Sequence, residues 1–181
     1  MMIPEILENL KHELIHGFSK RKHPFRYFSF GTIQNNNVSL RTVVLRKVLP
    51  DFTTIIYTDT RSQKVAHIKK NNTVSALFYH PKKLLQIRLD GKAIVVTDKE
   101  ELKPFWSAVG ENAKKDYTTA LAPGAIINNP DAVNYSDNEP NFCIIKIIPN
   151  HIEYLQLKRP NHIRVGFDKT ENGFKGSFLV P

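Results

Sequence analysis

Hydrophobic residues recur along this chain at two spacings, one typical of helices and one of strands, and together they divide it into successive elements. From Pro4 to Phe18 the apolar positions recur at helical spacing, which predicts an amphipathic first helix that ends near Gly17. The run 26–33 is rich in aromatic and β-branched residues, and the polar stretch 34–37 follows it as a turn. We therefore predict a β-hairpin after the first helix.

Further along, strand patterns dominate and two more helices are expected. Ser62 is placed to cap a helix that runs through Lys69, and Asp98 to cap another that runs to about Val109. Asp90-Gly91 indicates a bulge within its strand. The segment 120–141, with three prolines and little periodicity, is expected to be an irregular excursion. The remaining predicted strands are 40–48, 53–58, 73–79, 84–97, 142–148, 152–157, 163–167 and 174–180.

Many short strands around few helices favour a mainly β domain with helices (α+β), built as a closed or nearly closed β-barrel. With 181 residues and 41% hydrophobic content, the chain suits one core, so we expect a single domain over 1–181. No apolar run approaches the roughly 20 residues that cross a bilayer, and the N-terminus lacks a basic region followed by an apolar one. We expect no membrane contact and a cytoplasmic location.

The formal net charge of +9 would attract anions in general, including nucleic acid. Part of the excess lies in 20–23 and 69–70, where a solvated basic face is the more common explanation, so nucleic acid is not the partner we expect. The single cysteine, Cys143, lies in an apolar run that predicts burial as a small hydrophobe. The seven histidines do not fall at metal-ligand spacings, so we expect no metal site.

The start of the helix near residue 62 combines groups that bind phosphate. A helix N-terminus has unpaired N–H groups and a partial positive charge, to which Ser62 adds a hydroxyl and Arg61 and Lys64 add charge. An ordinary capped helix with solvated cations has the same pattern. Arg41 begins a neighbouring strand and could meet the same anion through bidentate hydrogen bonds, although an edge-strand arginine in water is the alternative.

The strand 41–46 could present backbone N–H and C=O groups to the edge of a planar heterocycle. A flavin needs such donors at its pyrimidine end, where negative charge collects on reduction. Gln86 and Arg88, two residues apart, face one side of their strand and could supply further donors. They could equally form the polar outer face of a barrel strand.

These motifs together resemble the signature for flavin mononucleotide (FMN) in the pyridoxamine 5'-phosphate oxidase family, a dimeric split β-barrel. The resemblance covers about 27–96 and rests on Arg41-Thr-Val-Val-Leu-Arg46, Tyr57-Thr58, Arg61-Ser62-x-Lys64 and Gln86-x-x-x-x-Gly91-Lys92-Ala93. It implies that Arg41, Ser62 and Lys64 bind the FMN phosphate, with Arg61 as a further candidate, and that Gln86 reaches a flavin bound mainly by the other subunit. The full set that it implies for FMN is Arg41, Thr42, Val43, Val44, Leu45, Arg46, Tyr57, Thr58, Arg61, Ser62, Lys64, Gln86 and Arg164.

The C-terminal part follows the family pattern only partly. His162-Ile-Arg164 matches a His-x-Arg pair of the true oxidases, and the resemblance makes Arg46 and His162 candidate substrate residues. Leu155 stands in place of a tryptophan expected over the flavin, and Pro160 in place of an arginine expected at the substrate phosphate. No catalytic residue follows from the sequence.

The leading interpretation is an FMN-binding enzyme, a homodimeric flavin-dependent oxidoreductase that acts on an unidentified small molecule. One alternative is a true pyridoxamine 5'-phosphate oxidase, which would serve pyridoxal phosphate synthesis or salvage. Another is a non-enzymatic barrel that binds flavin or nucleic acid.

Overall fold

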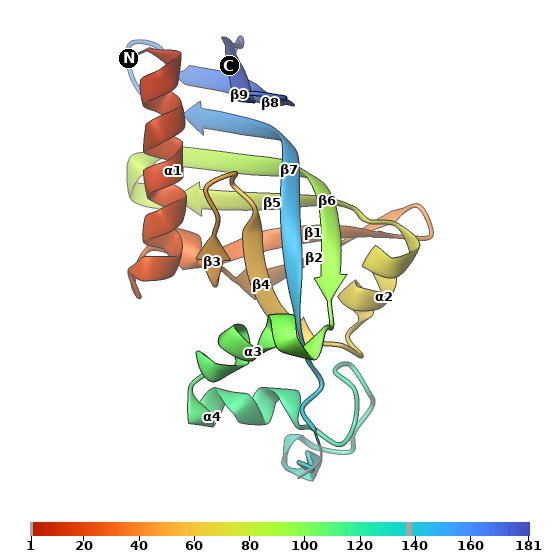
Figure 1. Ribbon diagram of the computed structural model, residues 1–181. Coiled ribbons are helices and arrows are strands. Elements are labelled where there is room, and N and C mark those ends of the chain that lie inside the picture. Colours follow the sequence, from red (N-terminus) through yellow and green to blue (C-terminus); the bar gives the residue numbers. More distant parts are fainter. Residues whose placement is uncertain (1, 137–138) are drawn as a thin grey trace.

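The computed structural model describes residues 2–136 and 139–181, and its described strands form one nine-stranded antiparallel sheet (Figure 1). The strand order is β2-β1-β5-β6-β7-β4-β3, and β8 and β9 continue from β7. The strands are β1 (Tyr27–Gln34), β2 (Asn37–Val44), β3 (Lys47–Val48), β4 (Thr54–Asp59), β5 (Thr73–His80), β6 (Leu85–Val96), β7 (Phe142–Gln156), β8 (Ile163–Thr170) and β9 (Gly173–Phe178). The α-helices are α1 (Ile3–Ser19), α2 (Gln63–Lys70), α3 (Lys99–Ser107) and α4 (Glu111–Lys114).

The two ends of this sheet, β2 and β3, are consecutive in the chain and are joined by Leu45 and Arg46 alone. Leu45 N–H donates to the carbonyl of Arg26 at 2.8 Å, and Arg46 N–H donates to the carbonyl of Ile55 at 2.9 Å. Because two residues span about 7 Å at most, the sheet must curl until its ends lie side by side. The α+β prediction is confirmed. The barrel is not closed by strand pairing, because β2 and β3 do not pair with each other. The strand predicted over 40–48 is interrupted at Leu45 and Arg46.

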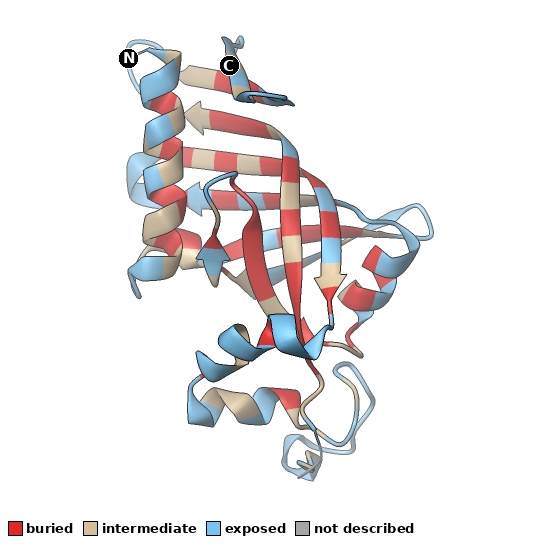
Figure 2. Ribbon diagram, in the orientation of Figure 1, coloured by how far each residue is buried: buried red, intermediate tan, exposed pale blue. Residues whose placement is uncertain are grey.

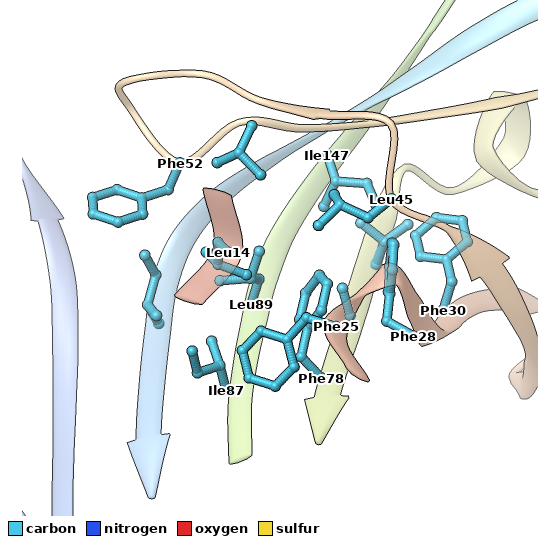
Figure 3. Packing of buried hydrophobic residues seen from close by; sticks show 14 of the residues in the cluster. Leu14, Phe25, Phe28, Phe30, Leu45, Phe52, Phe78, Ile87, Leu89 and Ile147 are labelled. Atoms are coloured by element: carbon cyan, nitrogen blue, oxygen red, sulfur yellow. The ribbon is translucent and has the colours of Figure 1, made fainter. Parts of the chain in front are cut away.

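The main core fills the inside of the curled sheet, and α1 covers its open end (Figure 2). Leu14 of α1 lies with Phe25 and Leu45 in this core (Figure 3). A Cβ atom on Gly17 would come within 2.8 Å of Phe25 Cβ and 2.9 Å of a Leu45 methyl group. Gly17 therefore permits close packing of the helix, which continues for two residues to Ser19 and ends where the basic run begins, with Lys20 as its C-cap, so the predicted end near Gly17 is correct to within two residues.

A second, smaller core lies between β4 and the helices that follow β6. Ile56 of β4 belongs to the main core, whereas its neighbour Ile55 belongs to the second. The buried members of the second core are Ile55, Val96, Leu102, Val109, Tyr117, Phe142 and Ile144. The strand β4 is thus covered on both faces, so its side chains pack alternately into the main core and into the second core.

The chain leaves the sheet after β6 and returns to it as β7. Asp98 Oδ1 accepts the Glu101 N–H at 2.9 Å, so the predicted cap of α3 is confirmed. Of the excursion predicted over 120–141, the described residues 120–136 and 139–141 are irregular as predicted, apart from a 3₁₀ turn at Pro130–Ala132 and an isolated bridge between Thr119 and Tyr135; residues 137–138 lie outside the described residues. The two strands predicted over 142–157 are one long strand, β7.

The predicted bulge occurs between Asp90 and Gly91, where the register with β7 shifts. A Cβ atom on Gly91 would lie 2.1 Å from the Ile148 carbonyl oxygen, so only glycine fits this backbone approach. Cys143 is fully buried, as predicted, and burial raises the pKa of its thiol to about 12. Among the helices of the described ranges, none is both long and apolar enough to span a bilayer.

Candidate functional site

Hydroxyl, ammonium and backbone N–H groups meet where α2 begins. Ser62 is the N-cap residue, but its hydroxyl lies 3.2 Å from Thr58 Oγ1 and forms no capping bond. Lys64 Nζ donates to the same Thr58 oxygen at 2.9 Å. Helix geometry leaves the N–H groups of Gln63 and Lys64 without an intrahelical acceptor. The start of α2 therefore offers several donors to one small volume.

Arg41 of β2 approaches the same place from the inner face of the sheet. Its Nη1 donates to the Phe30 carbonyl at 3.1 Å and to Thr32 Oγ1 at 2.8 Å, and its Nη2 donates to Ser39 Oγ at 2.6 Å. Burial lowers the pKa of Arg41. Burial also lowers the pKa of Lys64, and the positive charge of Arg41 lowers it further, so the two cations repel each other.

We call Arg41, Thr58, Ser62 and Lys64 the phosphate cluster. Two half-buried cations that repel each other favour an anion between them. The carboxylate whose field reaches Lys64 is Asp59, and Asp59 is already paired with Arg61. The structure thus brings together the residues to which the sequence resemblance assigns the phosphate, while their binding role stays a prediction.

The Arg61 side chain points to Asp59 and to the segment that follows the helices after β6. Its guanidinium donates to Asp59 through Nε at 3.1 Å and Nη2 at 2.7 Å, and to the carbonyls of Thr119 at 2.9 Å and Ala120 at 3.2 Å. The hydrogen bond with Asp59 is the main reason that the pKa of Arg61 is raised. The structure therefore places Arg61 as an anchor between β4 and the excursion, and not with the phosphate cluster.

Arg46 and Tyr57 lie on the side of the second core. The Arg46 Cζ atom is 5.1 Å from the centroid of the Tyr57 ring, a cation–π distance. Burial raises the pKa of Tyr57, and the charge of Arg46 opposes that rise. Arg46 Nε is buried and has no hydrogen-bond partner among the described residues. An orphaned buried donor of this kind fits a site that a ligand completes.

The rest of the predicted stretch 42–45 supplies backbone and packing. Thr42 and Val44 face outward, whereas Val43 packs against the main core and Leu45 is buried within it. Because β2 ends the sheet, one edge of its backbone has no strand partner in the described part of the chain. Such an edge agrees with the expected contact to the rim of a heterocycle.

The C-terminal candidates lie on the opposite, outer face of the sheet. Gln86 pairs with Leu155, and Leu155 pairs with Arg164, so the three residues form one row across β6, β7 and β8. Arg164 Nη2 donates to the buried carboxylate of Glu153 at 2.8 Å, and Arg164 Nε is buried without a partner among the residues described. We call Gln86, Leu155 and Arg164 the outer row. The candidate substrate residue His162 precedes β8, is exposed and accepts the Lys158 N–H at 3.1 Å.

Beside the outer row the sheet presents exposed apolar side chains. Val38 and Leu40 of β2 are 70% and 68% exposed, and Tyr79 of β5 is 50% exposed. Leu40, Leu77 and Arg88 are among the residues that line a hollow of about 660 Å³ on this face. Contiguous exposed apolar area of this kind marks an interaction surface.

Two groups of polar residues escaped the sequence reasoning. Thr32 adjoins Arg41, which donates to its hydroxyl, and the same Thr32 Oγ1 atom lies 2.9 Å from His67 Nδ1. Glu153 holds Arg164. Only the position of His67, three residues after Lys64 on the same helix, could have suggested the first group.

Far from these sites, the ligand atoms of Glu13, His23 and His80 lie within 4.8 Å of one another. The Nδ1 atoms of both histidines accept backbone N–H groups, from Phe25 at 3.2 Å and from Lys83 at 3.3 Å. Each neutral ring therefore carries its proton on Nε2, and His23 Nε2 lies 3.3 Å from Glu13 Oε2. Glu13 is paired with Lys83 through Oε1, whereas its Oε2 is buried without a hydrogen-bond partner among the described residues. A proton on each Nε2 leaves that atom no lone pair for a metal, and the expectation of no metal site stays a prediction.

Comparisons with known proteins give the same picture at the level of the fold. A family model described as "Pyridoxamine 5'-phosphate oxidase, FMN-binding domain" matches residues 7–97. A pyridoxamine 5'-phosphate oxidase-related, FMN-binding protein from Nostoc punctiforme superposes with a TM-score of 0.80 and 22% sequence identity, covering 100% of both chains. PhzG from Burkholderia lata, in complex with tetrahydrophenazine-1-carboxylic acid, has a TM-score of 0.79 and 17% identity, covering 100% of this chain and 98% of its own.

General Stress Protein 26 from Bacillus anthracis is also similar, with a TM-score of 0.54 and 20% identity, covering 86% of this chain and 98% of its own. No curated protein matches the sequence. At these identities the structural matches establish a shared fold.

Proposed function

The chain belongs to the family of pyridoxamine 5'-phosphate oxidase FMN-binding domains, and we propose that it is a homodimeric FMN-dependent oxidoreductase acting on a small molecule. The proposal takes 1–181 as one FMN-binding domain in the cytoplasm. When bound, FMN supplies the hydride and electron transfer. The residues of this chain bind it, orient it and exclude water from it.

One observation carries the proposal: at the start of α2 the half-buried Lys64 donates to the Thr58 hydroxyl, which lies beside Ser62, and Arg41, also half-buried, is linked to the same helix through Thr32 and His67. A phosphate monoester dianion fits this set, because it accepts charge-assisted hydrogen bonds from a guanidinium, an ammonium and helix N–H groups at once. The open edge of β2 and the orphaned Nε of Arg46 supply further donors for the remainder of the flavin or for an anionic substrate.

The homodimer is proposed because the two halves of the expected site lie on different faces of one protomer. Arg41 points to the inner face with Phe30, whereas Gln86 points to the outer face with Tyr79. A second copy packed on the apolar outer face would bring its outer row to the first copy's phosphate cluster. Closed twofold assembly is the commonest way in which a chain covers such a face.

PhzG, which shares this fold, was solved in complex with tetrahydrophenazine-1-carboxylic acid. In this chain, a planar anionic substrate would find the Arg46 guanidinium beside the ring of Tyr57. Arg46 and, from a subunit placed as proposed, His162 are the residues that we assign to substrate binding.

The experiment is an FMN titration of purified protein, followed by flavin fluorescence, with the absorbance spectrum of the protein as isolated. We expect a yellow protein, or one that takes up FMN stoichiometrically. The Arg41→Ala/Lys64→Ala double variant should lose FMN and keep its circular dichroism spectrum. Its matched control is Arg21→Ala/Lys69→Ala, which removes one arginine and one lysine from exposed positions. A folded protein that does not take up FMN would overturn the proposal.

A further inference from the structure

Behind the phosphate cluster, three polar side chains form a buried chain of hydrogen bonds. Arg41 Nη1 lies 2.8 Å from Thr32 Oγ1, and Thr32 Oγ1 lies 2.9 Å from His67 Nδ1. Thr32 is 1% exposed and His67 is 4% exposed. The three residues come from β2, β1 and α2, so the chain connects the end strand of the sheet to the helix whose N-terminus holds Lys64.

The direction of each hydrogen bond follows from the chemistry of the groups. A guanidinium only donates, so Thr32 Oγ1 accepts from Arg41 and has one proton left to donate. Thr32 is buried and its proton has no other acceptor among the described residues, so the arrangement that satisfies this hydroxyl makes His67 Nδ1 the acceptor and leaves the hydrogen of the neutral ring on Nε2. The pKa of His67 is lowered by burial and by the charges of Arg41 and Lys70, which keeps the ring in this neutral form.

These hydrogen bonds fix the position of the Arg41 guanidinium and leave some of its N–H groups for a ligand. Three of its five N–H groups donate to Phe30, Thr32 and Ser39, while Nε–H and one Nη2–H have no partner among the described residues. A free arginine side chain has about 2 kcal/mol of rotamer entropy to lose when it is fixed on a ligand. Fixing it beforehand improves affinity by preorganisation.

We propose that His67 is a positioning residue for phosphate binding, acting through the Thr32 hydroxyl to hold Arg41 in the geometry that receives the anion. This inference rests on the proposed function and extends it to two residues that do not themselves contact the ligand. Thr32 and His67 therefore contribute to the affinity for the phosphate of FMN and not to the affinity for the ring system.

The test compares FMN with riboflavin, which lacks the phosphate, in fluorescence titrations of five proteins. Thr32→Val removes the hydroxyl at nearly constant volume, and His67→Leu removes the acceptor; each should weaken FMN binding about tenfold and leave riboflavin binding unchanged. Thr32→Ser restores the hydroxyl, and His67→Asn offers Oδ1 where Nδ1 stood, so both should bind FMN within about twofold of wild type. Equal losses for FMN and riboflavin would overturn the positioning role.

A double-mutant cycle gives the second readout. In an Arg41→Ala background, Thr32→Val and His67→Leu should cause no further loss of FMN affinity, because the group that they position is gone. A further tenfold loss in that background would overturn the inference. If Arg41→Ala weakens FMN binding while Thr32→Val and His67→Leu do not, this inference fails and the proposed function stands; if the wild-type protein binds no FMN, the proposed function fails.

Discussion

Lys64 donates a hydrogen bond from Nζ to the Thr58 hydroxyl at 2.9 Å, so its side chain folds back over the first turn of its own helix. A lysine on α2 could extend into solvent, as Lys69 does. Lys64 instead gives up hydration in a place where Arg41 repels it. The arrangement costs free energy in the empty protein, and we expect an anion bound at the phosphate cluster to offset that cost.

Replacing Lys64 by Met, which has a similar length and no charge, should therefore separate stability from binding. FMN affinity should fall about 10- to 100-fold, because a charge-assisted hydrogen bond contributes about 1.5–3 kcal/mol. Urea unfolding of the FMN-free variant should show stability equal to or above that of wild type. Lys69→Met, at an exposed position on the same helix, is the matched control, and unchanged FMN affinity in Lys64→Met would contradict the assignment.

Arg61→Ala tests whether this arginine anchors the excursion or holds the phosphate. Asp59, whose side chain is 3% exposed, would be left unpaired, so we expect a loss of about 1–3 kcal/mol in the free energy of unfolding. The segment 118–136 should also be cleaved faster in limited proteolysis. Asp59→Asn/Arg61→Ala, which removes the orphaned charge, should recover part of the stability. A loss of FMN affinity as large as in Arg41→Ala, at wild-type stability, would instead make Arg61 a phosphate ligand.

Gly91→Ala should destabilise the protein by more than about 3 kcal/mol, because the new methyl group would lie 2.1 Å from a backbone oxygen of β7 that cannot move aside. Thermal and urea denaturation measure the effect. Gly110→Ser is the control, since a Cβ atom there meets nothing within 4 Å. Equal stability of the two variants would mean that β6 and β7 do not approach as described.

Acid should weaken the FMN-free protein through His23 and His67. Burial is the main cause that lowers the pKa of each below 6.5 in the folded state. The unfolded chain then binds more protons, so stability that is fully present above about pH 6.5 is lost as the pH falls through that value toward the folded pKa values. Urea unfolding on either side of pH 6.5 should show the decline, and a His23→Asn/His67→Asn variant should show less of it. Stability that rises on acidification would contradict both shifts.

Leu40→Glu should produce monomers that bind FMN poorly, because it places a charge in the centre of the apolar outer face. Leu40 is 68% exposed in the single chain, so the substitution disturbs no core contact. Light scattering coupled to size-exclusion chromatography measures the mass. Ile126→Glu, at a residue that is 97% exposed in the excursion, is the control and should behave as wild type. A Leu40→Glu protein that remains dimeric would exclude this face as the interface.

Local signals in the sequence predicted those parts of the fold that local interactions decide. Asp98 caps α3 through its own side chain, and Asp90-Gly91 forms a bulge because of its backbone geometry. The break at Leu45 was missed because nothing in an apolar run marks the point where a strand passes from one end of a sheet to the other. The strands predicted over 142–148 and 152–157 are continuous in the structure, because Pro149 pairs with Gly91 at the bulge, where proline is tolerated.

In the candidate site too, features set by local sequence were predicted and features set by distant neighbours were not. The family resemblance predicted that Arg41, Ser62 and Lys64 would meet, and the helix start at Ser62 is a local feature. The prediction that Arg41 begins its strand is wrong, because β2 begins four residues earlier, at Asn37, directly after the hairpin turn. The partner of Arg61 could not be predicted, since Asp59 and the carbonyls of Thr119 and Ala120 compete with any ligand for the same guanidinium. His67 and Glu153 were missed because their roles depend on neighbours that are distant in sequence.

The excursion between β6 and β7 has one more consequence. Val96 and Ile144 pair at the end of the two strands, so the chain leaves and re-enters the sheet at the same point, and the family model ends at residue 97, where the excursion begins. Residues can be inserted or removed between these points without changing the register of any strand. The segment 97–141 can therefore change in length while β6 and β7 keep their pairing, provided that it still supplies the side chains of the second core that cover β4.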